Sequence, residues 1–230
     1  MQLEEYLTRD DRVVLPVGST EQHGYLSVET DNIIAERLAV EAADGLGVPV
    51  LPVLPYGVTG FVAYPGSPTL APETFASVVR DIVDSLYRQG FRRVLIANAH
   101  GGNKPDHPAI RSWIASREDA ELLWHDVWDG PPDALAAEID ADFDHASWSE
   151  NFPWTRLPGV RIPRTRKPPV TPPDVDTPER WREALGDGSF GGLYQRPDAE
   201  VLRVWEAAVK QLRERLENGW SRPEPIRADP

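Results

Sequence analysis

Hydrophobic residues fall into short β-branched runs that alternate with stretches of helical spacing. The runs predict strands over residues 12–17, 93–97 and 121–127. The helical stretches predict helices over 3–8, 31–44, 72–89, about 105–117 and about 197–217. Strands and helices that alternate without hairpin signals indicate βαβ units and a mainly parallel sheet covered on both faces. We therefore predict an α/β fold with three layers, α/β/α.

Other segments depart from this alternation. Residues 48–55 have a strand pattern but contain three prolines, so we expect an edge position or irregular pairing. Residues 56–71 form a loop longer than a simple connection needs. Residues 158–178 hold seven prolines and predict an irregular arm or lid, and a glycine-rich turn follows at 186–192. We find no internal repeat and predict a single domain over residues 1–230.

Composition and charge narrow the classes of function. The net charge of −13 argues against nucleic acid or an anionic membrane as a partner, because both need a basic surface. The absence of cysteine excludes disulfides, thiolate nucleophiles and zinc–sulfur sites. No apolar run approaches the ~20 residues of a membrane span, and the first residues lack the apolar core of a signal peptide. We expect a cytoplasmic protein.

Metal-competent side chains follow two of the predicted strands. Glu21 and His23 come shortly after the first strand, and His100 lies in a polar, glycine-rich segment after the second. In parallel α/β sheets the carboxyl ends of the strands form the edge where ligands bind. Asp31 opens the next helix, where it could simply be the N-cap. A later polar and aromatic segment supplies His145 and Glu150.

Together these residues are sufficient for a site with two metal ions. Such a site needs one bridging carboxylate and about two further ligands for each ion. The candidate ligands are Glu21, His23, Asp31, His100 and Glu150, with Asp31 as the bridge. Each of them alone could have a structural role, in a solvated turn or a helix cap, but their shared edge favours the metal site. Histidine and carboxylate ligands suit Zn, Mn or Fe. We expect His107, within a helix, and His125 to be structural.

Several segments resemble the creatininase (creatinine amidohydrolase) family. Residues 15–24 with Thr30 and Asp31 look like its signature, and 98–103 is similar to its Asn-Gly-His-Gly-Gly-Asn segment. Residues 64–70, 145–150 and 188–192 resemble its Phe-Pro-Gly-Thr loop, its His-Ala-Gly-x-x-Glu-Thr segment and its late glycine turn. The resemblance runs in order from about residue 12 to 192. It implies an α/β metal-dependent hydrolase with a paired-ion site, usually a homo-oligomer, with a hexamer as one possible form.

The resemblance also implies how the ligands divide between the ions. Glu21, Asp31 and His100 would bind one ion, and His23, Asp31 and a further glutamate would bind the other. In creatininase that glutamate lies two residues after the histidine that matches His100, at the position of Gly102 in this chain. Glu150 is the substitute, as in relatives with the Gly-Gly form.

Catalytic residues follow from the same resemblance. His145 matches the family position proposed to shuttle protons, and imidazole, with a pKa near 6.5, can both accept and donate one. Glu150 is the second candidate for that role.

Two departures from the family bear on the substrate. The segment from Gly24 to Glu29 is one residue shorter than usual and lacks a second histidine, and Gly60 and Phe61 replace a Glu-His pair. Both lie in loops expected to contact the substrate, so we predict that true creatininase activity is absent. The candidate pocket residues are Tyr25, Phe61, Tyr64 and Trp148.

The predicted activity is hydrolysis of a C–N bond in a cyclic or small amide. One alternative keeps the metal site but opens a cyclic ketone or lactone, such as an inosose-like polyol ring, or deformylates a formamide. A further alternative is a metal-binding protein without catalysis, which would bind metal but turn over no ring substrate.

Overall fold

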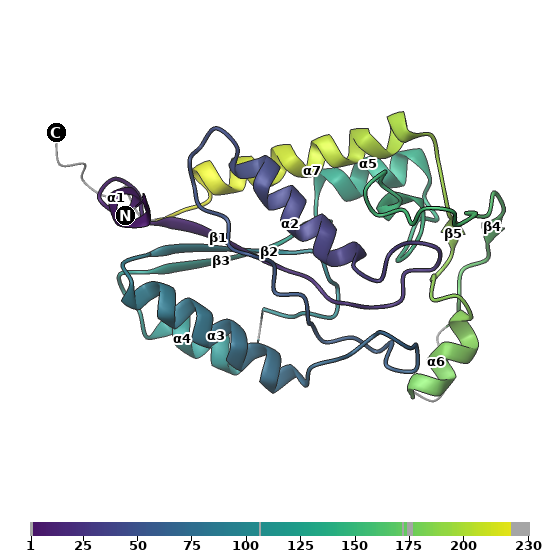
Figure 1. The fold of residues 1–230 in the computed structure, drawn as a ribbon, viewed down its shortest axis with the longest axis horizontal. Helices are drawn as coiled ribbons and strands as arrows, with labels where there is room; N and C mark the ends of the chain where they lie inside the picture. Colours follow the sequence, from purple (N-terminus) through teal and green to yellow (C-terminus); the bar gives the residue numbers. More distant parts are fainter. Residues whose placement is uncertain (1, 106, 172, 174–176, 222–230) are drawn as a thin grey trace.

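A parallel sheet forms the centre of the protein, whose computed structural model describes residues 2–105, 107–171, 173 and 177–221. Its strands are β1 (Arg12–Val17), β2 (Arg93–Asn98) and β3 (Glu121–Asp126), side by side in that order (Figure 1). The register sets Val17 beside Asn98 and Asn98 beside Asp126. The carboxyl ends of the three strands therefore meet at one edge.

Alternate residues of each strand enter two separate hydrophobic cores. In β1, Val13 and Leu15 pack into one core, whereas Val14 packs into the other. In β2, Ile96 and Leu95 divide in the same way. A sheet buried on both faces explains why these strands are uninterrupted apolar runs in the sequence.

Helices cover both faces of the sheet. One layer contains α2 (Thr30–Ala43), α5 (Pro131–Ile139) and α7 (Asp198–Asn218), and the other contains α3 (Pro72–Arg88) and α4 (Pro108–Ala115) (Figure 1). This arrangement confirms the predicted three-layer α/β fold. Among the helices of the described residues, none is both long and apolar enough to cross a membrane.

Residues 48–55 extend the sheet only partly. They lie along the free side of β1 and form isolated parallel bridges, Val50 with Val14 and Leu54 with Val17. The three prolines of this segment have no N–H group to complete a ladder of hydrogen bonds. The expectation of irregular pairing at an edge is confirmed.

Several elements were not predicted. They are α5, α6 (Pro178–Leu185), the short 3-10 helix η1 (Trp148–Glu150), and a small antiparallel pair of β4 (Arg166–Lys167) and β5 (Gly192–Leu193). Within the predicted arm at 158–178, β4 joins the arm to the glycine-rich turn, and residues 172 and 174–176 lie outside the described residues. The opening helix, α1 (Gln2–Tyr6), is shorter than expected.

The predicted helix over 105–117 begins later than expected. In the structure His107 precedes α4, and its ring nitrogen accepts a hydrogen bond from the backbone N–H of Ala109 at 3.2 Å. The prediction that His107 lies within the helix is therefore wrong: its side chain caps the helix, and Pro108 occupies the first turn, where the missing N–H costs nothing.

A buried arginine ties the start of β2 to the chain before β1. Arg93 is only 3% exposed; its Nη2 lies 3.2 Å from Asp10 and its Nε donates to Asp11. Arg93→Ala should lower the free energy of unfolding by about 3 kcal/mol, because Asp11 loses its buried partner, whereas Asp10 keeps its ion pair with Arg12. Urea denaturation measures this loss.

The control Arg88→Ala removes an ion pair whose arginine side chain is 69% exposed, and we expect a loss of about 0.5 kcal/mol or less. Equal losses in the two variants would contradict this account.

Candidate metal centre

A glycine at the end of β1 lets the strand end and the start of α2 lie close together. A Cβ atom on Gly18 would lie 2.3 Å from Oδ1 and 2.9 Å from the backbone nitrogen of Asn32. No larger residue allows this approach without displacing the helix. The segment that carries Glu21 and His23 therefore runs beside the first turn of α2.

Asp31 lies in that first turn but does not cap the helix. The N-cap residue is Glu29, so the alternative in which Asp31 is simply the N-cap is wrong. Oδ1 of Asp31 lies 3.0 Å from Nε2 of His23, and Oδ2 lies 3.0 Å from Nδ1 of His100. The two oxygens of one carboxylate thus face two different imidazoles, as a carboxylate shared by two cations would.

The structure brings all five predicted ligands together. Nδ1 of His100 lies 3.3 Å from Oε1 of Glu21, and Nε2 of His23 lies 3.8 Å from Oε2 of Glu150. Two groups result, Glu21 with Asp31 and His100, and His23 with Asp31 and Glu150. In each group the potential ligand atoms lie within 4.8 Å of one another. Asp31 belongs to both groups.

Backbone carbonyls fix which nitrogen each histidine offers to the cluster. Nδ1 of His23 lies 3.1 Å from the carbonyl oxygen of Glu21, and Nε2 of His100 lies 2.8 Å from that of Val58. Because a carbonyl oxygen only accepts hydrogen bonds, these nitrogens are the donors. The other nitrogen of each ring is left facing the carboxylates, as in histidines that bind a metal through one ring nitrogen and donate from the other.

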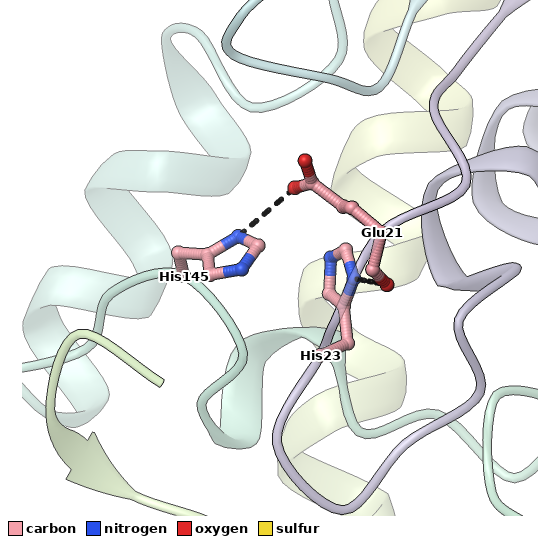
Figure 2. A group of neighbouring side chains, drawn as sticks. All are labelled: Glu21, His23 and His145. Atoms are coloured by element: carbon pink, nitrogen blue, oxygen red, sulfur yellow. Dashed lines mark hydrogen bonds and ion pairs between the residues drawn. The ribbon is translucent and has the colours of Figure 1, made fainter. Parts of the chain in front are cut away.

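His145 lies at the edge of this cluster, in the loop before η1. Its Nε2 lies 3.3 Å from the carbonyl oxygen of Gln22. Its Nδ1 lies 3.8 Å from Oε1 of Glu21 (Figure 2). It also forms a third potential ligand group, with Glu21 and His23. Burial, and then the positive charge of His23, lower the pKa of His145 to about 4, so its ring is neutral at neutral pH.

The five side chains predicted to bind metal are buried, and some of their polar atoms lack a hydrogen-bond partner. Glu21, the most enclosed carboxylate, is 1% exposed. Among the described residues, Oε2 of Glu21, Nε2 of His23 and Oδ2 of Asp31 have no hydrogen-bond partner. Unpaired buried groups of this kind are costly, and a cation bound between them would satisfy all three. This donor set of oxygen and imidazole nitrogen fits divalent Zn, Mn or Fe.

Several side chains of the cluster have raised pKa values, so protons occupy positions where cations would bind. Burial lowers the pKa of His23, but the adjacent carboxylate of Asp31 raises it overall to about 10. The pKa of His100 also lies well above its usual value, because the adjacent carboxylates of Asp31 and Glu21 outweigh the effect of burial. Burial raises the pKa of Glu150 to about 7. Because metal ligands must lose their protons, a divalent cation would take the place of these protons.

The cluster opens into a cavity of about 670 Å³. Glu21, Asp31, His100, His145 and Glu150 all reach its surface. The apolar part of the wall is mostly aromatic and comes from Phe61, Trp128, Phe143, Trp181 and Phe190. The cavity is large enough for a small molecule beside the metal ligands.

Of the four residues predicted to contact substrate, Phe61 lines this cavity, and its ring stacks on His145 with centroids 5.0 Å apart. The structure places the other three elsewhere. Tyr25 packs edge-on against Tyr194, and the hydroxyl of Tyr64 donates to the carbonyl of Gly186. Trp148 is fully buried in the hydrophobic core because η1 turns its ring inward.

Asn103 links three backbone segments of the site by hydrogen bonds. We had not assigned this residue to the site from the sequence. Nδ2 of Asn103 donates to the carbonyl oxygen of Gly18 and to Oδ1 of Asn98, and its Oδ1 accepts from the N–H of Val58. The carbonyl oxygen of Val58 also accepts the hydrogen bond that orients the ring of His100. The sequence did offer a signal for this role, because the polar segment 98–103 begins and ends with an asparagine.

Gly102 fits against His100 so closely that no side chain can be added. A Cβ atom here would lie 1.9 Å from the carbonyl oxygen of Val58 and 2.4 Å from Nε2 of His100. Gly102→Ala should therefore lower the free energy of unfolding in EDTA by about 1–3 kcal/mol through overpacking. Gly101→Ala is the matched control, since a Cβ there would meet nothing within 4 Å, and should change stability by less than about 0.5 kcal/mol. If Gly102→Ala left the free energy of unfolding unchanged, the contact of the added Cβ atom with Val58 and His100 would be relieved easily.

Comparison with known proteins decides the family. The model of the family described as "Creatininase: Creatinine amidohydrolase" matches residues 1–216. The chain belongs to the creatininase family. Solved creatininases share its fold: a mutant creatininase complexed with creatine has a TM-score of 0.77 at 22% identity, over 96% of this chain and 97% of that one. Solved forms of similar fold include one described as Zn-Zn and one as Mn.

Curated relatives of this creatininase-family chain have different activities. It is 33% identical over 98 residues to creatinine amidohydrolase of Pseudomonas putida, which is 40% of this chain and 38% of that protein. It is 29% identical over 103 residues to 3-dehydro-scyllo-inosose hydrolase of Thermotoga maritima, 44% and 33% of the two chains. It is 32% identical over 99 residues to mycofactocin precursor peptide peptidase of Mycolicibacterium smegmatis, 40% of each. The matches thus span well under half of each relative.

Proposed function

We propose that this protein is a metal-dependent hydrolase that uses two divalent ions to cleave a C–N bond in a cyclic or small amide. The observation that carries the proposal is the position of Asp31, with one oxygen 3.0 Å from His23 and the other 3.0 Å from His100. Two curated relatives, the creatinine amidohydrolase and the peptide peptidase, are named for cleavage of a C–N bond, which supports this bond type.

Five side chains would hold the ions. Glu21, Asp31 and His100 would bind one, and His23, Asp31 and Glu150 the other. When bound, paired ions of this kind lower the pKa of a water molecule and polarise a substrate carbonyl. The solved Zn-Zn and Mn creatininases favour zinc or manganese as the metal.

His145 would transfer the proton. Its Nε2–H is directed to the carbonyl of Gln22, so the unprotonated Nδ1 faces Glu21 and the cavity. From this position the ring could take a proton from the attacking water and deliver it to the leaving nitrogen. Phe61, stacked on the ring, would hold its plane. Glu150 suits this role less, because its Oε2 accepts a hydrogen bond from the N–H of Ala146 and faces His23.

A second candidate keeps the metal site and changes the bond. The similarity to 3-dehydro-scyllo-inosose hydrolase favours opening of a cyclic keto-polyol. Polar side chains at the cavity, Thr59 and Ser149, could bind ring hydroxyl groups. For either activity we also propose a homo-oligomer, as the family resemblance implies.

A substrate panel tests the proposal. The metal-loaded protein would be incubated with lactams and cyclic ureas, formamides, small linear amides and cyclic keto-polyols, and products would be followed by NMR. We expect turnover of a lactam, cyclic urea or small linear amide that stops in EDTA. Turnover confined to keto-polyols would favour the second candidate, and turnover confined to formamides would indicate a deformylase. Bound metal without any turnover would indicate a protein that binds metal without catalysis.

A further inference from the structure

The cavity beside the metal cluster is rich in carboxylates. Among the described residues, no lysine or arginine lines it. Its lining includes five carboxylates, Glu21, Asp31, Asp133, Asp144 and Glu150. The electrostatic potential that a ligand meets on entry is therefore set by carboxylates and by whatever cations the cluster holds.

Two of these carboxylates lie outside the metal cluster. Asp133 lies in the first turn of α5, and Asp144 directly precedes His145. Both are exposed, and no ion pair between described residues includes either of them. Several basic residues that follow them in the chain are engaged elsewhere: Arg156 pairs with Asp198, Arg166 pairs with Asp140 and Asp142, and Lys167 pairs with Asp187.

Buried polar atoms without a partner lie at the base of the same cavity and indicate a site for a ligand. Oε2 of Glu21 and Oδ2 of Asp31 are buried without a hydrogen-bond partner among the described residues. Both side chains are at least 98% buried, and both reach the cavity surface. The acidic rim is therefore part of a ligand site and not an isolated surface patch.

Aromatic rings form the other part of the wall. The ring centroid of Phe190 lies 6.0 Å from that of Phe61 and 6.0 Å from that of Trp181. Aromatic faces attract amine and guanidinium cations, and they do so best where carboxylates also lower the potential. The wall thus combines the two features that recognise an organic cation.

We propose that the substrate is an amide that carries a positively charged amine or guanidinium group away from the scissile bond, and that anionic amides are selected against. This inference rests on the proposed hydrolytic function of the same site. Asp133 and Asp144 would be specificity-determining residues that act on the end of the substrate away from the scissile bond. Neither is a proposed metal ligand, and Asp144 accepts a hydrogen bond from the backbone N–H of His145.

Binding of three matched amides tests this inference. Isothermal titration calorimetry would compare 4-guanidinobutanamide, 5-hydroxypentanamide and glutaric acid monoamide on the metal-loaded, full-length protein at low ionic strength. We expect the cationic amide to bind about 10-fold more tightly than the anionic one, because two rim carboxylates and the aromatic wall each contribute a factor of a few. Salt near 0.5 M should reduce this ratio, since exposed charges are screened.

Variants show whether the two aspartates cause the preference. Asp133→Asn combined with Asp144→Asn should lower the ratio to about 2-fold, whereas Glu138→Gln, on an exposed position of α5 outside the cavity lining, should leave it unchanged. Equal or weaker binding of the cation, no binding of it, or a ratio unaffected by the double variant would overturn the inference. Tighter binding of the cation without hydrolysis of any amide would instead contradict the proposed function alone.

Discussion

Replacing Asp31 with asparagine should remove both metal ions from the protein at once. The variant keeps the size of the side chain but leaves one oxygen and no charge between His23 and His100, which lie 3.0 Å from the two oxygens of Asp31. Paired ions supply several kcal/mol of transition-state stabilisation, so turnover should fall on the order of 10³-fold or more. Elemental analysis by mass spectrometry, together with turnover of the best substrate, measures both effects.

Two further variants make this result specific. Glu36→Gln removes an exposed carboxylate from the same helix and should change neither metal content nor turnover. Glu150→Gln should weaken the binding of one ion only, because Glu150 belongs to one of the two groups that contain Asp31. Normal metal content in Asp31→Asn would show that Asp31 is not a shared ligand.

Replacing His145 with alanine should abolish turnover without removing the metal. Loss of a general acid or base costs about 10²–10⁴-fold in rate. Nδ1 of His145 lies 3.8 Å from Glu21, and the ring belongs to neither of the groups that Asp31 joins, so both ions should remain. Metal analysis and turnover on the same preparation separate the two effects.

A second histidine provides the control for His145. His107→Ala removes the cap of α4 and should cost about 1 kcal/mol of stability, with turnover unchanged. If His145→Ala loses one ion together with activity, the third potential ligand group, His145 with Glu21 and His23, is the metal site in use.

The layers of the fold could be predicted because the strands alternate between two cores. Residues 13–17 of β1 and 94–97 of β2 are all apolar, and such runs are typical of a sheet buried on both faces. In contrast, α6 has only one fully buried residue, Leu185, and α5 is a short helix rich in alanine and proline. Neither has enough apolar residues to give a clear period, so both were missed.

The cluster of Glu21, His23, Asp31, His100 and Glu150 could be predicted from the strand ends and from the family resemblance. The groups that orient them could not, because the carbonyls of Glu21, Gln22 and Val58 are backbone atoms without a sequence signal. The cavity wall was also largely missed. Trp181 lies on α6, which had not been predicted, so the wall was assigned to aromatic residues near the motifs, such as Tyr25.

We propose that hydrolysis needs two ions held around Asp31. Adding metal back to the stripped protein tests this requirement. The full chain would be stripped with a chelator, dialysed and titrated with Zn²⁺ or Mn²⁺, and turnover would be recorded against the molar ratio of metal to protein. We expect negligible turnover without metal and a plateau at about two equivalents. Full turnover in the stripped protein, or a plateau at one equivalent, would contradict this requirement.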